Sequence, residues 1–394
     1  MKTVFFRYLV SVLAALLVGV PALAADAPAP VKIGMVTTLS TGAGYLGEDM
    51  RDGFMLAVEQ GDGTLGGVPV EVLVADDGRD PAQARQNITR MMQAEHVDLM
   101  TGVIFSNVAV ATVPKVVRSD MIYISPNAAP SDLAGAMCHK NYFAVSYQND
   151  HIDEAMGRYV DEHGYDSVYL LAPNYPAGKD HIAGFKRYYN GDIVGEDYTR
   201  LGETDYAGAI AAVRAAEPDA VFFFYPGGMG INFVKQYVQA GLIDDVPLFG
   251  PAFSFDNTLV DAIGAAAVGI HNTAQWSRDL DVPANQQFVA DYIEAYGHEP
   301  TLYASQGYDT ARLIGSALQA VDGDVDDIDA VRAALAAADF ESVRGDFAFA
   351  ANHHPIHDIY VRKVVQEDDG NFTNVLVDRV FENHEGAYVD QCSM

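Results

Sequence analysis

Residues 31–60 read VKIGMVTTLSTGAGYLGEDMRDGFMLAVEQ, and this stretch sets a pattern that the rest of the chain repeats. The apolar, β-branched run at 31–39 predicts a strand, and the small residues after it predict a loop. Apolar residues then recur at helical spacing over 48–60. Repeated strand–helix units of this kind predict parallel sheets that are covered by helices on both faces.

The same alternation returns along the chain in two successive sets. Further strands are predicted at 70–75, 97–104 and 121–125 in the first set, and at 168–172, 220–225, 247–251 and 269–274 in the second. Helices are predicted at 81–94, 152–162, 205–216, 285–296 and 302–320, and short strands around 353–365. We therefore expect an α/β fold with two doubly wound parallel-sheet lobes.

The first 24 residues have the layout of a secretory signal peptide. Lys2 and Arg7 precede an apolar run at 8–20, and the small-residue pattern Ala22-Leu23-Ala24 follows it. The apolar run is shorter than the roughly 20 residues that span a membrane, so a retained anchor is the weaker alternative. We therefore expect residues 1–24 to be removed from a secreted protein.

Composition limits the possible partners. The chain has a formal net charge of −30, and a surface of this sign repels nucleic acid and anionic lipid. Acidic residues are spread along the chain, and 49% of the residues are hydrophobic, which favours a folded protein over a disordered one. No nucleic-acid partner is expected.

The two cysteines, Cys138 and Cys392, are the only ones in the chain. In an oxidising compartment the simplest expectation is one disulfide between them, which would tie the C-terminus to the first third of the chain. Two free thiols are the alternative.

The glycines Gly42, Gly44 and Gly47 fit the G-x-G-x-x-G pattern of a dinucleotide site. That fingerprint also requires an acidic residue about 20 positions further on. Here the candidates Asp76 and Asp77 lie about 30 residues beyond the last glycine. We expect no cofactor, and we expect the glycines to let backbone amides approach a different ligand at a helix N-terminus.

The sequence HHPIHD at 353–358 raises the possibility of a metal site. Because no cysteine or third spaced ligand completes a zinc-like set, hydrogen-bonded or solvated histidines are expected instead, and no metal. A catalytic nucleophile is also missing, since the chain has no G-x-S-x-G elbow and Cys138 and His139 are adjacent residues that point apart. We therefore do not expect an enzyme.

From Val31 to the C-terminus, the chain resembles the leucine/isoleucine/valine-type (type I) periplasmic solute-binding proteins of ABC transporters. The resemblance depends on Ile33-Gly34, 42–53, Asp76-Asp77, 102–107, 124–128 and Gly307-Tyr308-Asp309. The stretches 172–175 and 226–230 are more similar to the branch often linked to aromatic and other carboxylates.

This resemblance implies a clamp of two lobes joined by three crossovers, with a ligand buried in the cleft between them. It implies a periplasmic receptor, expected to be a monomer, that delivers its ligand to an ABC transporter permease in the inner membrane. A ligand sensor with the same clamp is an alternative. The expected lobes are 26–147 plus 276–350, and 148–275 plus 351–394.

Loops at the carboxyl ends of parallel strands, together with the resemblance, predict the ligand-binding residues. They are Tyr45, Leu46, Phe105, Ser106, Asn127, Ala128, Ala129, Tyr175, Gly227, Phe253, Gln275 and Trp276. The resemblance assigns a ligand carboxylate to Ser106 and to the loop at 127–129. Tyr175, Phe253 and Trp276 offer aromatic surface, with ordinary core packing as the alternative for each.

The chain departs from the amino-acid-binding branch at two positions. That branch places a threonine where this chain has Ala129, and an acidic residue that holds the ligand ammonium where it has Ala252. A buried ammonium without an acceptor is costly. We therefore expect a small carboxylate without an ammonium group, with an aromatic acid favoured and a branched-chain or other amino acid as the alternative.

Overall fold

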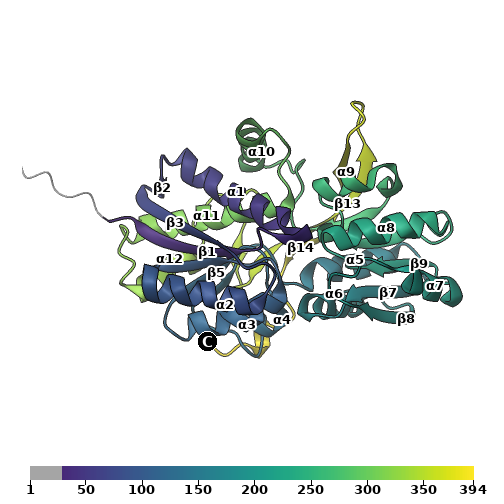
Figure 1. The fold of residues 1–394 in the computed structure, drawn as a ribbon, viewed down its shortest axis with the longest axis horizontal. Coiled ribbons are helices and arrows are strands. Elements are labelled where there is room, and N and C mark those ends of the chain that lie inside the picture. The colour runs from purple at the N-terminus through teal and green to yellow at the C-terminus, as the bar shows by residue number, and fades with distance from the viewer. Residues whose placement is uncertain (1–28) are drawn as a thin grey trace, which may run out of the picture.

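The computed structural model describes residues 29–394, so the predicted signal peptide lies outside the described residues. Two α/β lobes lie side by side (Figure 1). Within 29–394, no helix is both long and apolar enough to cross a membrane.

The first lobe is built on a six-stranded sheet with the order β2-β3-β1-β4-β5-β6. Its strands are β1 (Val31–Thr37), β2 (Thr64–Leu65), β3 (Val68–Asp76), β4 (Leu99–Gly102), β5 (Ile122–Ser125) and β6 (Tyr142–Ala144). All pairs are parallel except the short hairpin of β2 and β3. Its helical segments are η1 (Thr41–Ala43), α1 (Tyr45–Gln60), α2 (Pro81–Arg90), η2 (Met91–Glu95), α3 (Ser106–Val117), α4 (Ser131–Ala134), α10 (Pro283–Tyr296), α11 (Leu302–Ala320) and α12 (Ile328–Ala337).

Two glycines allow α1 and α11 to pack closely. A Cβ atom on Gly53 would lie 1.9 Å from the carbonyl oxygen of Ala304, and one on Gly307 would lie 1.9 Å from that of Met50. A side chain at either position would therefore push the helices apart. This close packing fixes α11, which carries Tyr303 toward the second lobe.

The second lobe is built on an eight-stranded sheet with the order β12-β13-β11-β10-β9-β7-β8, and β14 pairs with β13. Its strands are β7 (Ser167–Pro173), β8 (Asp192–Thr199), β9 (Ala220–Phe223), β10 (Leu248–Pro251), β11 (His271–Ala274), β12 (Ala348–Phe349), β13 (Pro355–Gln366) and β14 (Phe372–His384). Its helical segments are α5 (His151–Glu162), α6 (Pro176–Tyr188), α7 (Ala207–Ala216), α8 (Gly228–Gln239), η3 (Ala252–Ser254), α9 (Asn257–Ile263) and η4 (Gly264–Ala267). A last turn, η5 (Val389–Gln391), precedes the C-terminus.

The predicted two-lobed α/β class is confirmed, with one correction. The second sheet is not wholly parallel, because β12, β13 and β14 pair in antiparallel fashion. The predicted short strands around 353–365 are one long strand, β13, whose hairpin with β14 rises above the second lobe (Figure 1). The chain passes between the lobes after β6, after β11 and after α12, while the predicted residue boundaries of the lobes stay a prediction.

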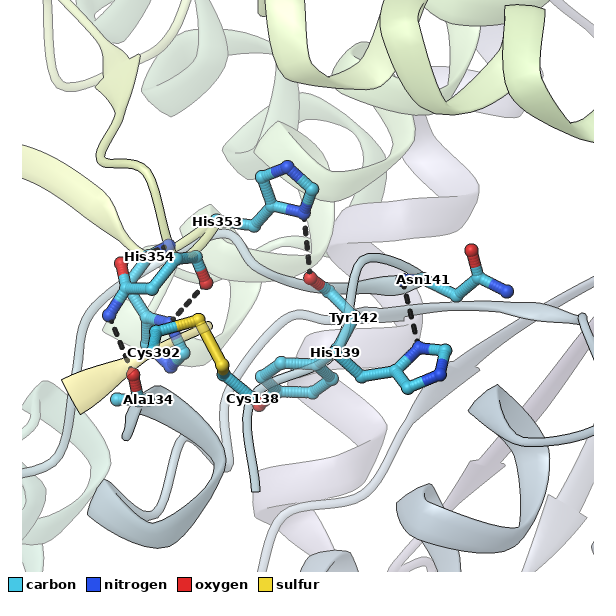
Figure 2. The surroundings of a disulfide bond; sticks show 9 residues. Ala134, Cys138, His139, Asn141, Tyr142, His353, His354 and Cys392 are labelled. Atoms are coloured by element: carbon cyan, nitrogen blue, oxygen red, sulfur yellow. Dashed lines mark hydrogen bonds between the residues drawn. A yellow bond between two sulfur atoms is a disulfide. The ribbon is translucent and has the colours of Figure 1, made fainter. Parts of the chain in front are cut away.

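The predicted disulfide is present between Cys138 and Cys392. Figure 2 shows it together with the turn at 353–354, where His353 Nδ1 lies 3.3 Å from the carbonyl oxygen of Tyr142. The tail after β14 thus leaves the second lobe and ends on the first. His354 is buried and hydrogen-bonded, so the solvated alternative is wrong for it.

Candidate functional site

A small cavity lies where the two lobes meet. It is lined from the first lobe and its crossover by Ile104, Phe105, Ser106, Asn127, Tyr147, Asn149 and Tyr303, and from the second lobe by Tyr175, Ala177, His181, Phe224, Pro226 and Phe253. Its volume is about 20 Å³, which is room for roughly one water molecule. A ligand the size of a benzene ring can therefore enter only if the lobes or the lining side chains move.

A larger hollow of about 260 Å³ lies elsewhere, between the end of α1 and the side of α11. Residues such as Gln60, Gly66 and Arg312 line it, and all of its lining belongs to the first lobe. Because ligands of open α/β folds bind at the carboxyl ends of the strands, the smaller cavity between the lobes is the better candidate.

One end of the cavity is suited to an anion. Ser106 begins α3, which follows directly on the loop after β4. The first hydrogen bond within this helix runs from the Val108 amide to the Phe105 carbonyl oxygen, so the amides of Ser106 and Asn107 precede it. The positive end of the helix dipole and the Ser106 hydroxyl therefore face the same space as the cavity.

Amide side chains complete this polar end. Asn149 donates a hydrogen bond to the Ser106 hydroxyl at 3.0 Å. Asn127 donates to the carbonyl oxygen of Ile104 at 2.7 Å and accepts from the Tyr147 hydroxyl at 3.1 Å. These bonds fix the orientation of both amides before any ligand arrives.

The other end of the cavity is aromatic. Tyr175 is the N-cap residue of α6, and its ring lies 6.2 Å from Phe224 and 6.5 Å from Phe105 of the opposite lobe. Phe253 lies 5.0 Å from the ring of Tyr147 and meets Phe224 edge to face. Rings in this arrangement form a slot for a flat, apolar body.

A buried ionisable pair supports the aromatic wall. His181 lies in the second turn of α6 and is 1% exposed, and its Nδ1 atom pairs with the carboxylate of Asp153 in the first turn of α5. Burial raises the pKa of Asp153 to about 6, although the nearby His181 opposes part of that shift.

Polar contacts join the lobes beside the cavity. The Asp180 carboxylate, on α6, accepts hydrogen bonds from the Ser131 amide at 3.1 Å and from the Asn149 side chain at 2.8 Å. Burial raises the pKa of Asp180 to about 6. Within the first lobe, the Arg79 guanidinium lies 5.6 Å from the ring centroid of Phe105.

Five of the predicted ligand-binding residues line the cavity together: Phe105, Ser106, Asn127, Tyr175 and Phe253. Ala128 and Ala129 lie in the same loop as Asn127 but do not line the cavity, and the Ala129 amide donates to Asn149 Oδ1 at 3.3 Å.

Three predicted residues meet at another point of the interface. A Cβ atom on Gly227 would lie 3.5 Å from the Tyr45 hydroxyl and 3.7 Å from the side chain of Leu46. Gly227 has φ 65 and caps α8, a conformation that favours glycine. None of the three lines the cavity.

Gln275 and Trp276 lie in the second crossover and not in the cavity. Trp276 is buried, donates to Asn285 Oδ1 at 2.7 Å and packs against Phe288. Core packing, the alternative considered for Trp276, therefore describes its surroundings. The side chain of Gln275 is buried and has no hydrogen-bond partner within residues 29–394.

Sequence reasoning missed eight lining residues: Ile104, Tyr147, Asn149, Ala177, His181, Phe224, Pro226 and Tyr303. Tyr147 and Asn149 follow β6, a three-residue strand that was not predicted, and the rule that sites lie at strand ends would have found them with it. His181 and Tyr303 lie inside helices, where nothing in the local sequence marks them.

Each lining residue is uncharged except for the ionisable His181. Asp256 is buried as the N-cap of α9, where it accepts from the Leu259 amide at 3.0 Å, and burial raises its pKa to about 7. Glu203 accepts from the Thr204 amide, and neither acid reaches the cavity.

Across 29–394, no group of three or more acidic, histidine or cysteine side chains is placed to hold a metal ion.

Known proteins share this two-lobed fold. A family model described as a periplasmic binding protein matches residues 30–371. A Leu/Ile/Val-binding protein homolog from Brucella melitensis is 26% identical and covers 87% of this chain and 90% of its own length.

Solved structures extend the comparison. A solute-binding protein of an ABC transporter from R. palustris, in complex with benzoate, has a TM-score of 0.87 and 30% identity, covering 93% of this chain and 100% of that one. A second, from Rhodopseudomonas palustris BisB5 in complex with 3,4-dihydroxybenzoic acid, has a TM-score of 0.83 and 26% identity, covering 90% and 98%. An ABC transporter substrate-binding protein from Sphaerobacter thermophilus has a TM-score of 0.84 and 32% identity, covering 90% and 98%.

Proposed function

This chain belongs to the periplasmic binding protein family, and from its cavity we propose that it binds an aromatic carboxylate and delivers it to an ABC importer. It is a solute-binding protein of the ABC-transporter type and not an enzyme. Which class of solute the protein binds depends on the side chains between the lobes.

The observation that carries the proposal is the division of the cavity into a polar end and an aromatic end. Ser106 and the start of α3 supply donors, which suit a carboxylate, while Asn149 donates to Ser106 and to Asp180. Tyr175, Phe224 and Phe253 supply ring surface, which suits an aromatic body. An aromatic acid matches both ends at once.

The same cavity is poorly suited to an amino acid. An α-ammonium needs an acceptor of negative charge, and no aspartate or glutamate lines the cavity. Ala252 stands where the amino-acid-binding branch carries that acid, and Asp256 is turned toward the start of α9. An amino acid would thus leave its ammonium poorly paired, at a cost of several kcal/mol.

The related proteins support two candidate ligands. The similar structures at 30% and 26% identity hold benzoate and 3,4-dihydroxybenzoic acid, which favours the aromatic acid. The curated relatives at 26% identity are named for leucine, isoleucine and valine, so a branched-chain amino acid is the second candidate.

The proposed partner is a membrane permease, and the proposed working form is a monomer that closes around one ligand molecule. Because the cavity holds only about 20 Å³, we expect the lobes to separate for ligand entry and then to close. A membrane-bound sensor could use the same clamp, and a pull-down against the permease or a sensor kinase separates these roles.

Isothermal titration calorimetry with benzoate and with leucine tests the ligand class. We expect benzoate or a ring-substituted benzoate to bind and leucine to bind far more weakly. Submicromolar binding of leucine, without binding of any benzoate, would establish the amino-acid alternative.

A further inference from the structure

His181 is held in one orientation by contacts on three sides. Its ring stacks on Phe224 with the centroids 3.7 Å apart, and it meets Phe253 edge-on at 5.6 Å. Its Nδ1 atom pairs with Asp153, whose side chain is fully buried. A ring fixed in this way cannot turn to satisfy its second nitrogen elsewhere.

That second nitrogen, Nε2, is a polar atom of the aromatic wall that the pairing with Asp153 leaves without a partner among the described residues. Within residues 29–394 the only hydrogen bond of the His181 side chain is the one from Nδ1 to Asp153, while the residue itself lines the cavity. One oxygen of Asp153, Oδ1, has no hydrogen-bond partner in the same part of the chain, so His181 is the main partner of this buried carboxylate. A buried carboxylate paired with histidine fixes which ring nitrogen carries the proton.

The chemistry of the pair defines what Nε2 can bind. When the Nδ1–H group of the neutral imidazole donates a hydrogen bond to the Asp153 carboxylate, Nε2 carries no proton and is an acceptor. The groups around it, Phe224 and Phe253, are rings of the aromatic end of the cavity. A ligand ring held between these side chains would bring its substituents within reach of the acceptor.

We propose that His181 makes the site selective for aromatic acids with a hydroxyl group on the ring, an inference that rests on the aromatic-acid function proposed above. The ligand hydroxyl donates to Nε2, and Asp153 acts as the positioning residue for the imidazole. Unsubstituted benzoate leaves Nε2 buried and unpaired, and a site built around such a bond rejects the analogue that lacks the hydroxyl.

Calorimetric titration of the full-length mature protein with benzoate, 3-hydroxybenzoate and 4-hydroxybenzoate tests this selectivity. We expect at least one hydroxybenzoate to bind the wild type about tenfold or more tightly than benzoate. In His181→Phe, which keeps a flat ring against Phe224, we expect the ratio of hydroxybenzoate affinity to benzoate affinity to fall to about one. His163→Phe, at the end of α5 and outside the cavity, is the matched control and should keep the wild-type preference.

Asp153→Asn tests the positioning role. It should weaken hydroxybenzoate binding more than benzoate binding, whereas simple structural damage would weaken both alike. If His181→Phe fails to fold with Asp153 left unpaired, the double variant Asp153→Asn/His181→Phe removes the buried charge and serves in its place. The inference would be overturned if the wild type bound benzoate as tightly as both hydroxybenzoates. It would also be overturned if the preference for a ring hydroxyl survived in His181→Phe. A folded protein that binds none of the three acids would instead overturn the proposed function.

Discussion

The carboxylate of Asp180 in the second lobe accepts a hydrogen bond at 3.1 Å from the backbone amide of Ser131 in the first lobe. The same oxygen accepts from Asn149, which also donates to Ser106 at the polar end of the cavity. One carboxylate therefore connects closure of the lobes to the group that is proposed to hold the ligand. This relationship makes Asp180 a residue that affects affinity although it does not line the cavity.

Asp180→Ala should weaken ligand binding by about three- to tenfold, because the closed form loses its two hydrogen bonds to a charged acceptor. Calorimetry measures the affinity, and small-angle scattering measures how far the ligand compacts the protein. Asp192→Ala, an exposed aspartate at the start of β8, is the control and should change neither quantity. An Asp180→Ala variant with wild-type affinity would show that this contact does not contribute to closure.

Ser106→Ala should lower affinity for the aromatic acid by at least about tenfold, since a hydrogen bond to a charged group contributes about 1.5 to 3 kcal/mol. The fold should be unaffected, because the hydroxyl bonds to Asn149 and not to the helix. Thermal unfolding checks the fold and calorimetry checks the affinity. Ser119→Ala, beyond the other end of α3, is the control, and equal affinities in all three proteins would remove Ser106 from the site.

The strand-end loops were predictable because apolar runs that end in small or polar residues mark buried parallel strands. Ser106 comes four residues after the end of β4 and Asn127 two residues after the end of β5, and both line the cavity. Strand β8 was missed because it reads DIVGEDYT, in which acidic residues and a glycine interrupt the apolar pattern at a largely exposed edge.

The lining residues on helices could not be predicted in this way. His181 occupies an ordinary helical position, and its role depends on the distance from α6 to Asp153 on α5, which no local pattern encodes. Trp276 shows the reverse case, since it lies two residues after β11 yet its indole bonds to Asn285 in α10. Position after a strand predicts proximity to the cleft, but tertiary packing determines which way a side chain turns.

Asp256→Asn should stabilise the protein at pH 8 by about 1 to 3 kcal/mol, because burial raises the pKa of Asp256 to about 7 and ionisation in the folded state is costly. A carboxyl whose pKa is raised on folding stabilises the folded protein fully at pH values below the pKa that it has in the unfolded chain. This stabilisation is lost as the pH rises through about 7, the pKa of Asp256 in the folded protein. The difference between variant and wild type should therefore shrink as the pH falls from 8 to 4. Asparagine can still accept the bond from the Leu259 amide.

Denaturant unfolding at several pH values between 4 and 8 measures this difference. Asp327→Asn, at the exposed N-cap of α12, is the matched control and should change stability little at any of these pH values. A constant difference between Asp256→Asn and wild type across the range would contradict the effect of burial.

Replacing both cysteines, Cys138→Ala with Cys392→Ala, should lower the free energy of unfolding by about 2 to 5 kcal/mol while leaving ligand affinity unchanged. The bond joins residues 254 positions apart and holds a tail that leaves β14 in the second lobe, contacts Arg187 through Tyr388 and ends on the first lobe. A link across so long a loop restricts the unfolded chain strongly, whereas neither cysteine lines the cavity.

Guanidinium unfolding with and without dithiothreitol measures the effect. The reductant should move the unfolding midpoint of the wild type to that of the double variant, and it should leave the midpoint of the double variant unchanged. If the wild type and the double variant unfold at the same midpoint, the tail is held by its non-covalent contacts and the disulfide adds little.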